Sequence, residues 1–413
     1  MASNSILVIG GGFAGLTAAL EAAEIGHEVF IVEKTPFLGG RVMQLNKYFP
    51  KLCPPSCGLE IQYQRIKNNP KVKFFTLAEV TKVEGSVGNY DVTVHIKPRF
   101  AAPNSPDLSE LCGCLTTEVA NDFEFGLNTR KPVYMDAPFA FPQRYVVDKA
   151  NLSESDKVAV QKCDYLDLTE EEKDITLNVG SIVVATGWKP YDVTNLSNLG
   201  AGSVKNCISN MQMERIASPF GPTEGKILRP SDGRAPKKIA FVQCAGSRDE
   251  NHLHYCSYIC CMASLKQAQY VREQYPDAEV TIYYIDLRTP GRYDGFAKKV
   301  LADEKIAAVK GKVAAVEQDK AGDDVWVTVE DAVSCTKSVE RFDLVVLATG
   351  MQPSLAGTTL PFDVPIDAEG FIVGGEEKGI FAAGCAKQPL DVMKSAQSAT
   401  GAAMKAIQTV RGR

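Results

Sequence analysis

A glycine-rich turn near the start of the chain constrains the fold more than any other feature. Residues 5–9 read Ser-Ile-Leu-Val-Ile, a short apolar segment, and the next six read Gly-Gly-Gly-Phe-Ala-Gly. Residues 16–25 have the composition of a helix, and residues 28–32 form a second apolar segment that leads into Glu33. A strand, a Gly-x-Gly-x-x-Gly turn, a helix and a second strand make a βαβ unit. We therefore expect an α/β fold with a parallel sheet.

The spacing of these residues also predicts a dinucleotide site. The first glycine makes the tight turn, the second lets a pyrophosphate approach the backbone, and the third packs the helix against the strand. The N-terminus of the helix faces the phosphates. Glu33 follows Gly15 by 18 residues and can bond a pair of ribose hydroxyls. The residues expected at this site are Gly10, Gly12, Phe13, Ala14, Gly15, Glu33 and Lys34.

A second nucleotide-fold module is expected further along the chain, without a normal NADH site. Residues 237–285 contain an apolar strand, a helical stretch and another strand. Residues 242–247 stand where the glycine turn belongs, but they read Val-Gln-Cys-Ala-Gly-Ser, with one glycine. A tight pyrophosphate turn is not expected there.

The residues after Glu33 carry a resemblance to a known superfamily. Gly39-Gly40-Arg41 follows the acidic residue, residues 181–187 and 344–350 both end in Ala-Thr-Gly, and residues 379–384 read Gly-Ile-Phe-Ala-Ala-Gly. The chain thereby resembles the glutathione- and thioredoxin-reductase superfamily. The resemblance implies bound FAD and a thioredoxin-reductase-like two-module fold, an FAD-binding Rossmann-type domain plus a degenerate nucleotide-binding-fold domain. It adds to the site Gly40, Arg41, Ala185, Thr186, Gly187, Gly384 and Cys385.

One position departs from that superfamily. Its last strand ends in Gly-Asp, and the Asp bonds the flavin ribityl chain, whereas this chain has Gly384-Cys385. We expect the FAD domain to comprise residues 1–200 and 352–413, with an irregular excursion at about 98–148. Residues 201–351 would form the second module, with the loop-rich segment 205–235 as the hinge.

Four of the twelve cysteines form a candidate metal site. Cys244 ends a predicted strand, and Cys256, Cys260 and Cys261 follow. Spacing of i,i+4 would place Cys256 and Cys260 on one face of a helical turn. Four thiolates suit a [4Fe–4S] cluster, zinc suits the same ligands, and packing as core residues is a third interpretation.

The run from Gln243 to Ala268 resembles the signature of the A-subunit family of heterodisulfide reductases. In that family a cysteine, a gap and Cys-x-x-x-Cys-Cys hold a [4Fe–4S] cluster beside FAD, which implies the same role for the four cysteines here. The resemblance also implies that Lys266 lies near the flavin N5. The alternative for Lys266 is an ordinary solvated helix lysine.

Full members of that family carry ferredoxin-like cysteine repeats, and this chain has none. In this it resembles the A subunits of quinone-interacting membrane-bound oxidoreductases of sulfate reducers. This implies an electron-transfer subunit that links adenylylsulfate reductase to the menaquinone pool. Its partners would be a haem-bearing membrane subunit plus a second subunit with flavin and iron–sulfur groups. The alternatives are the corresponding subunit of a soluble, possibly electron-bifurcating heterodisulfide reductase-type complex, a scaffold subunit with a vestigial flavin, and a stand-alone pyridine-nucleotide disulfide reductase.

The last alternative would use Cys53 and Cys57. Two prolines stand between them, which argues against the helix that such enzymes use at this point. The isolated Cys163, Cys207 and Cys335 are expected to be core residues.

Charge and hydropathy restrict the partners and the location. With 45 Lys and Arg against 50 Asp and Glu, the net charge of −5 argues against nucleic acid. No run reaches roughly 18 apolar residues, and the first residues lack the pattern of a secretory signal. We expect a cytoplasmic protein, peripheral at the inner face of the membrane through its partner subunits.

Overall fold

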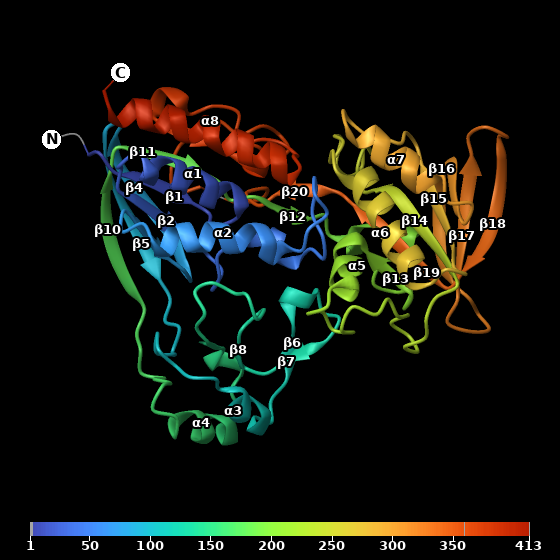
Figure 1. Ribbon diagram of the computed structural model, residues 1–413, viewed down its shortest axis with the longest axis horizontal. Coiled ribbons are helices and arrows are strands. Elements are labelled where there is room, and N and C mark those ends of the chain that lie inside the picture. The colour runs from blue at the N-terminus through green and yellow to red at the C-terminus, as the bar shows by residue number, and fades with distance from the viewer. Residues whose placement is uncertain (1–2, 359, 413) are drawn as a thin grey trace. The chain divides into compact units, whose positions relative to one another are not determined.

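The computed structural model describes residues 3–358 and 360–412, which form two units (Figure 1). Unit 1 comprises Met1–Trp188 and Pro353–Arg413, and unit 2 comprises Lys189–Gln352. The chain passes between them at β12 (Trp188–Pro190) and β20 (Met351–Pro353), which pair with each other. The segment 205–235 is not the hinge, because it contributes β13 (Cys207–Ser209) and α5 (Asn210–Ala217) to unit 2.

Unit 1 is built on a five-stranded parallel sheet in the order β21-β11-β1-β2-β3. The inner strands of this sheet are buried on both faces, as expected of a covered parallel sheet, whereas the edge strand β3 is only partly buried. The strands are β1 (Ile6–Ile9), β2 (Val29–Val32), β3 (Val72–Phe75), β11 (Ser181–Val184) and β21 (Ile380–Ala382).

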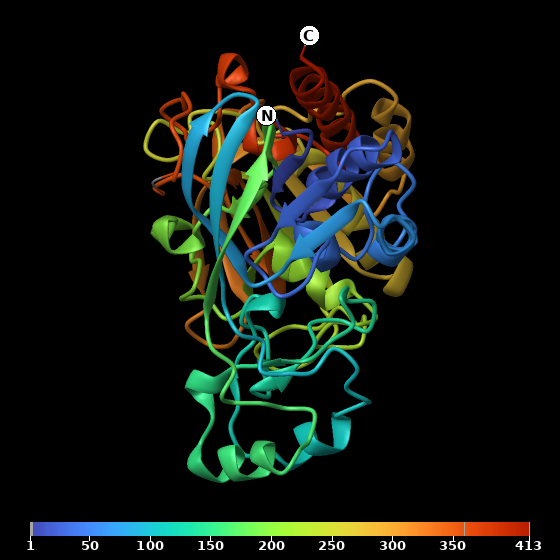
Figure 2. The same ribbon diagram turned by 90° about the vertical axis from the view of Figure 1, so that its left-hand side faces the viewer.

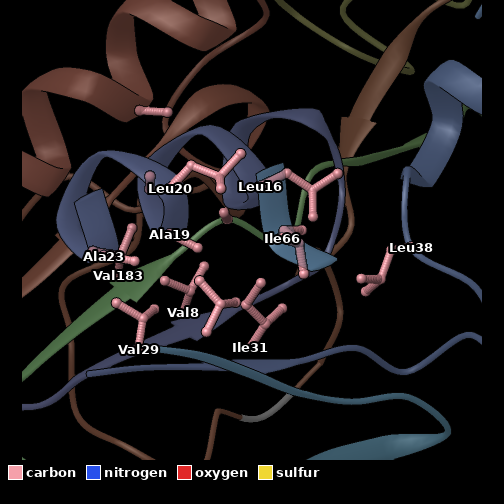
Figure 3. Close-up of a cluster of buried hydrophobic side chains, with 14 of the residues drawn as sticks. Val8, Leu16, Ala19, Leu20, Ala23, Val29, Ile31, Leu38, Ile66 and Val183 are labelled. Atoms are coloured by element: carbon pink, nitrogen blue, oxygen red, sulfur yellow. The ribbon is translucent and has the colours of Figure 1, made fainter. Parts of the chain in front are cut away.

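Three helices cover one face of this sheet: α1 (Phe13–Glu24), α2 (Pro55–Lys67) and α8 (Val392–Val410). Leu16, Leu20 and Ala23 point from α1 toward Val8 and Ile31 of the sheet (Figure 3). This apolar layer fixes α1 behind the glycine turn, because both ends of the turn are anchored in one core. The predicted βαβ unit is confirmed.

The opposite face of the sheet packs on three antiparallel strands, β4 (Ala78–Ser86), β5 (Asn89–Ile96) and β10 (Lys173–Val179), which Figure 2 shows next to one another. Side chains alternate along each strand, so Leu7 belongs to this second core while Ile6 and Val8 face the helices.

The residues between β5 and β10 form an excursion with a small core of its own. Val133, Val147 and Val160 are buried in it. Its elements are α3 (Ser109–Cys114), β6 (Val119–Ala120), β7 (Thr129–Arg130), β8 (Val133–Tyr134), β9 (Val146–Val147) and α4 (Glu154–Gln161). The strands have two residues each, so they add few backbone hydrogen bonds beside the apolar core.

Unit 2 contains a seven-stranded sheet in the order β13-β19-β14-β15-β16-β17-β18. The pairs from β13 to β16 are parallel, and β16, β17 and β18 form an antiparallel meander. Beside β13 and α5 the elements are β14 (Lys238–Ala245), α6 (Cys260–Gln274), β15 (Glu279–Tyr284), α7 (Tyr293–Leu301), β16 (Ile306–Gln318), β17 (Val325–Asp331), β18 (Thr336–Phe342) and β19 (Leu344–Thr349).

Candidate cofactor sites

The glycine turn of unit 1 leaves no room for side chains at two of its positions. Gly10 has a φ of +106°, and a Cβ there would lie 2.3 Å from Ala185 O. A Cβ on Gly15 would lie 1.8 Å from Gly10 O, where α1 meets β1. Only glycine fits at these two positions, for reasons internal to the fold.

Gly12 is different, because it has space. It is the N-cap of α1, and a Cβ there would meet only Gly40 Cα, at 3.8 Å. The fold therefore does not require a glycine at this position. A ligand that approaches the N-terminus of α1 closely would require it, as a pyrophosphate does.

Glu33 ties this turn to the end of β2. It is 9% exposed, and its Oε2 accepts a hydrogen bond from Gly11 N at 2.6 Å. Its Oε1 accepts from Thr35 N at 2.8 Å and from Thr35 Oγ1 at 2.7 Å. The neighbouring Lys34 has a side chain that is 76% exposed and pairs with Glu79 at the surface.

A second glycine turn lies against the first. Gly39 N donates to Gly11 O at 2.8 Å, and both Gly39 and Gly40 have positive φ. Arg41 follows in a 3-10 helix, Gly40–Gln44, and its Nη1 donates to Gln44 Oε1 at 2.9 Å. Burial lowers the pKa of Arg41, and the nearby Glu33 carboxylate opposes that shift.

Thr186 brings an unused hydroxyl to the same place. Ala185 N donates to Ile9 O at 2.7 Å, which fixes the end of β11 beside the first glycine turn. The Thr186 Oγ1 atom that follows is buried and has no hydrogen-bond partner within the described residues. Buried hydroxyls are normally bonded, so this atom marks a place where a polar ligand group fits.

The C-terminal part of the chain closes on the same turn. A Cβ on Gly384 would lie 2.8 Å from Ala14 Cβ, and Gly384 N donates to Ser398 Oγ of α8 at 3.1 Å. The Cys385 thiol lies 3.5 Å from Leu390 O and 3.8 Å from Ser395 Oγ, and burial raises its pKa. This side chain is engaged by the start of α8.

Sequence reasoning missed Asp391. It caps α8 by accepting from Lys394 N at 2.7 Å, and it is 4% exposed. Its other oxygen, Oδ2, is buried without a partner in the described part of the chain. An Asp directly before an amphipathic segment is a signal for a helix cap. It would have predicted the cap but not the buried Oδ2.

In unit 2, Cys244 lies at a bulge near the carboxyl end of β14. The register between β14 and β19 shifts between Val242 and Ala245, and Cys244 has a φ of +55°. A bulge turns a side chain away from its normal direction on the strand.

Cys256 and Cys260 are not on one helical face, and the prediction of a shared helical turn is wrong. Helix α6 begins at Cys260, and Tyr258 before it has a φ of +66°. A non-glycine residue in the left-handed region ends a right-handed helical path. Cys260 and Cys261 lie in the first turn of α6, and Cys256 lies in the loop before it.

Cys260 and Cys244 nevertheless lie close enough to the other three cysteines of the set for the charges of those thiols to affect them. Burial raises the pKa of Cys260 well above its usual range, and the charges of Cys261, Cys244 and Cys256 raise it further. Burial, followed by Cys261, raises the pKa of Cys244 to about 11. Among the described residues, no group of three or more His, Cys, Asp or Glu side chains has the arrangement of a metal site.

Lys266 is buried, so the alternative of an ordinary solvated lysine is wrong. Its side chain is 4% exposed, and Nζ lies 3.0 Å from Glu214 Oε1 of α5. Gln267 Nε2 donates to the same oxygen at 2.7 Å, and Tyr270 OH lies 3.4 Å from Glu214 Oε2. Helices α5 and α6 are thus joined by a buried ion pair with added hydrogen bonds.

Cys53 and Cys57 lie at the start of a helix, so the expectation that the prolines prevent one is wrong. Pro54 is the N-cap of α2 and Pro55 is its first residue, positions that tolerate proline because no backbone donor is needed there. Burial and the neighbouring Cys57 thiol raise the pKa of Cys53.

All twelve cysteines are free thiols. Cys207 is buried, which raises its pKa to about 12, and Cys163 is half-buried against the core of the excursion. Cys335 is exposed, so its prediction as a core residue is wrong. None of the helices described is both long and apolar enough to cross a bilayer.

Known proteins are similar to this chain in sequence and in fold. The profile of a family described as FAD dependent oxidoreductase matches residues 5–48, which contain both glycine turns. Two crystal structures share the fold: thioredoxin reductase of T. acidophilum (TM-score 0.53, 15% identity, 98% of each chain covered) and that of Lactococcus lactis (TM-score 0.54, 13% identity, 99% of this chain and 100% of that one). The expected thioredoxin-reductase-like α/β fold is confirmed.

Relatives found by comparison of sequences are more similar to this chain than the two thioredoxin reductases are. One of the iron-sulfur A subunits of the CoB–CoM heterodisulfide reductase of Methanopyrus kandleri is 35% identical over 98% of this chain and 64% of its own length. The A subunit of the H(2):CoB-CoM heterodisulfide,ferredoxin reductase of Methanothermobacter marburgensis is 36% identical over 99% of this chain and 64% of its own length. The chain spans less than two thirds of the length of these relatives. Over nearly all of its own length, the chain is a homologue of the A subunits of heterodisulfide reductase.

Proposed function

We propose that the chain is an FAD- and [4Fe–4S]-containing electron-transfer subunit of a heterodisulfide reductase-like complex. The observation that carries the proposal is the group of four mutually interacting thiols in unit 2, where a pyridine-nucleotide domain would have its glycine turn. The homologues include proteins named as iron-sulfur subunits, which supports the same assignment. When bound, FAD and the cluster would supply the transfer of electrons in steps of one or two.

In this proposal unit 1 holds FAD. The N-terminus of α1 and the space over Gly12 receive the pyrophosphate, and Glu33 accepts from a ribose hydroxyl. Arg41 balances negative charge at the second glycine turn. Thr186 Oγ1 and Asp391 Oδ2 are buried polar atoms that gain a partner from the ligand. Phe13, Ala14, Ala185, Gly187 and the backbone at Gly384 and Cys385 shape the cradle, and Lys34 stays at its surface.

Unit 2 holds the cluster through Cys244, Cys256, Cys260 and Cys261. Because burial raises the pKa of Cys244, Cys260 and Cys261, binding has to release protons from these thiols, and the bound metal offsets the cost. The cysteine-only ligand set suits iron–sulfur clusters and zinc alike, and it is the redox role of the homologues that favours iron.

We further propose that Lys266 acts on the flavin potential as part of its pair with Glu214. The two charges offset each other, so removal of either one leaves the opposite charge behind. Reduction adds negative charge to the flavin, which a cation favours and an anion disfavours. Lys266→Met should therefore lower the flavin midpoint potential, whereas Glu214→Gln should raise it. Potentials that stay unchanged in both variants would show that the pair is structural.

The partners follow from the family. The named relatives are A subunits, so we propose that this chain works with other subunits of a redox complex. The proposed complex passes electrons between adenylylsulfate reductase and menaquinone, and a haem-bearing subunit holds the chain at the inner face of the membrane. The alternative assembly is a soluble, electron-bifurcating complex of the heterodisulfide reductase type.

Purification under anaerobic conditions tests the cofactor assignment. Boiling the purified protein should release FAD. The protein should contain about four irons and four acid-labile sulfides per chain. FMN in place of FAD, or zinc without sulfide, would contradict the proposal. Co-purification of the chain from its native source would identify the complex, since the two assemblies have different subunits.

One observation favours a second function, that of a disulfide reductase. Cys53 and Cys57 both lie at the start of α2, in the unit that carries the glycine turns. Such an enzyme would oxidise NADH in the presence of a disulfide substrate, and Cys57→Ser would abolish that activity. We expect no such turnover, because unit 2 lacks a second glycine turn.

A further inference from the structure

An arginine lies beside the cysteines of unit 2. Arg248 belongs to the loop between Cys244 and Cys256, and its side chain is 24% exposed. The guanidinium and the Cys261 thiol both contact Asp286, which places them near each other.

The two terminal nitrogens of this guanidinium differ in their hydrogen bonds within the described residues. Nη2 donates to Asp286 Oδ2 at 2.9 Å, and the Cys261 thiol lies 3.5 Å from the backbone O of the same aspartate. Nη1 is buried and completes no hydrogen bond of normal geometry with any residue that the structure describes. A buried N–H of a charged group is rarely left in this state.

The loop fixes the direction of this side chain. Arg248 has a φ of +57°, and its N donates to Tyr255 O at 3.1 Å. The flanking Ser247 and Ser257 hydroxyls lie 2.9 Å apart, and Ser257 Oγ accepts from Met351 N at 2.9 Å. A strained backbone position that its surroundings hold in place is common at ligand sites.

We propose that Arg248 donates a hydrogen bond from Nη1 to a sulfur of the bound group and sets its redox potential. The inference rests on the proposed function, since it needs an iron–sulfur cluster at this site. Hydrogen bonds to the sulfurs and the net charge around a cluster are known determinants of its potential. Reduction adds negative charge next to the guanidinium, so Arg248 raises the potential, and Asp286 limits the effect by holding the other end.

A redox titration of the anaerobically purified chain, followed by the electron paramagnetic resonance of the reduced cluster, tests this role. At the wild-type midpoint, Arg248→Gln should lower the ratio of reduced to oxidised cluster by a factor on the order of ten. Arg248→Lys keeps the charge and should show a smaller decrease. Arg288→Gln is the matched control. Arg288 Nη2 lies 3.9 Å from the same Asp286 carboxylate, but its side chain is 50% exposed, so its removal should have a weaker effect.

The outcomes separate this inference from the proposed function. Wild-type protein without iron would refute the cluster itself. Full iron content with an unchanged potential in Arg248→Gln would overturn the role of Arg248 and leave the cluster in place. Loss of iron from both the Gln and the Lys variants would overturn it too, because a residue that only holds the loop behaves in this way. Loss of iron from Arg248→Gln alone, with a lowered potential in Arg248→Lys, would support the role of Arg248.

Discussion

At the scale of single residues, the three glycines of the first motif differ in what they do. Gly10 and Gly15 are required by the packing of β1, β11 and α1, whereas Gly12 has open space beside it. The motif therefore combines folding requirements with a ligand requirement, which the sequence alone cannot separate.

This difference gives a matched pair of variants. Gly12→Ala should fold with near wild-type stability and lose most of its FAD, because the methyl group occupies the space that the pyrophosphate needs. Gly15→Ala should be destabilised by several kcal/mol, since its Cβ meets a backbone oxygen. Thermal unfolding and flavin content measure both effects. If Gly12→Ala retained FAD, the phosphate would have to bind elsewhere.

The buried pair of Lys266 and Glu214 makes a second prediction. Lys266→Met removes the ammonium group that pairs with the buried Glu214 carboxylate and should cost about 3–5 kcal/mol. The double variant Lys266→Met with Glu214→Gln should be less destabilised than Lys266→Met alone. Chemical denaturation measures this, and Lys298→Met in the exposed pair with Asp294 is the control that should change little. Equal stability of Lys266→Met and that control would contradict the buried pair.

At the scale of elements, the sequence predicts helices and strands most accurately where the spacing of apolar residues and the turn residues indicate the same element. The βαβ unit follows from apolar strands, a helix and a glycine turn, and each of these has a local cause. The helix start at Cys53-Pro-Pro-Ser-Cys57 was missed because proline was treated as a helix breaker, although it is favoured at the first helical position. The loop at Cys256 was missed because i,i+4 spacing says nothing of Tyr258, whose φ of +66° depends on tertiary contacts.

One buried carboxylate joins two parts of the excursion. Asp156 is 1% exposed, and its oxygens accept from Thr116 N at 2.7 Å and Thr117 N at 3.0 Å. Burial acts to raise the pKa of Asp156, but the hydrogen bonds outweigh it and hold the pKa well below its usual range. A lowered folded-state pKa stabilises the fold above the ordinary carboxyl pKa of about 3.9, and this contribution disappears as the pH falls below that value.

Asp156→Ala should therefore destabilise the excursion by roughly 1–3 kcal/mol at neutral pH, because it leaves buried N–H groups unpaired. The difference from wild type should shrink as the pH falls below about 4. Hydrogen exchange in residues 109–161 measures this locally. Asp164→Ala, an exposed residue of the same segment, should have no such effect. A difference that does not change with pH would show that Asp156 acts through packing.

At the scale of the whole molecule, each unit carries a site of its own kind. The glycine cradle belongs to unit 1, and the four cysteines belong to unit 2. Local motifs in the sequence predict both sites, but Glu214 and Arg248 emerged only from the structure, because burial and pairing across distant segments have no local signal. The helix cap at Asp391 has a local signal, whereas its buried Oδ2 does not.

The ratio of iron to FAD in Cys256→Ser, with wild type and Cys114→Ser beside it, tests the central claim most directly. Cys114 is exposed, so its replacement controls for the loss of a thiol as such. Wild type and Cys114→Ser should contain about four irons per FAD, and Cys256→Ser should lose most of the iron and keep its FAD. Zinc without sulfide in the wild type would contradict the account, and so would loss of FAD together with the iron.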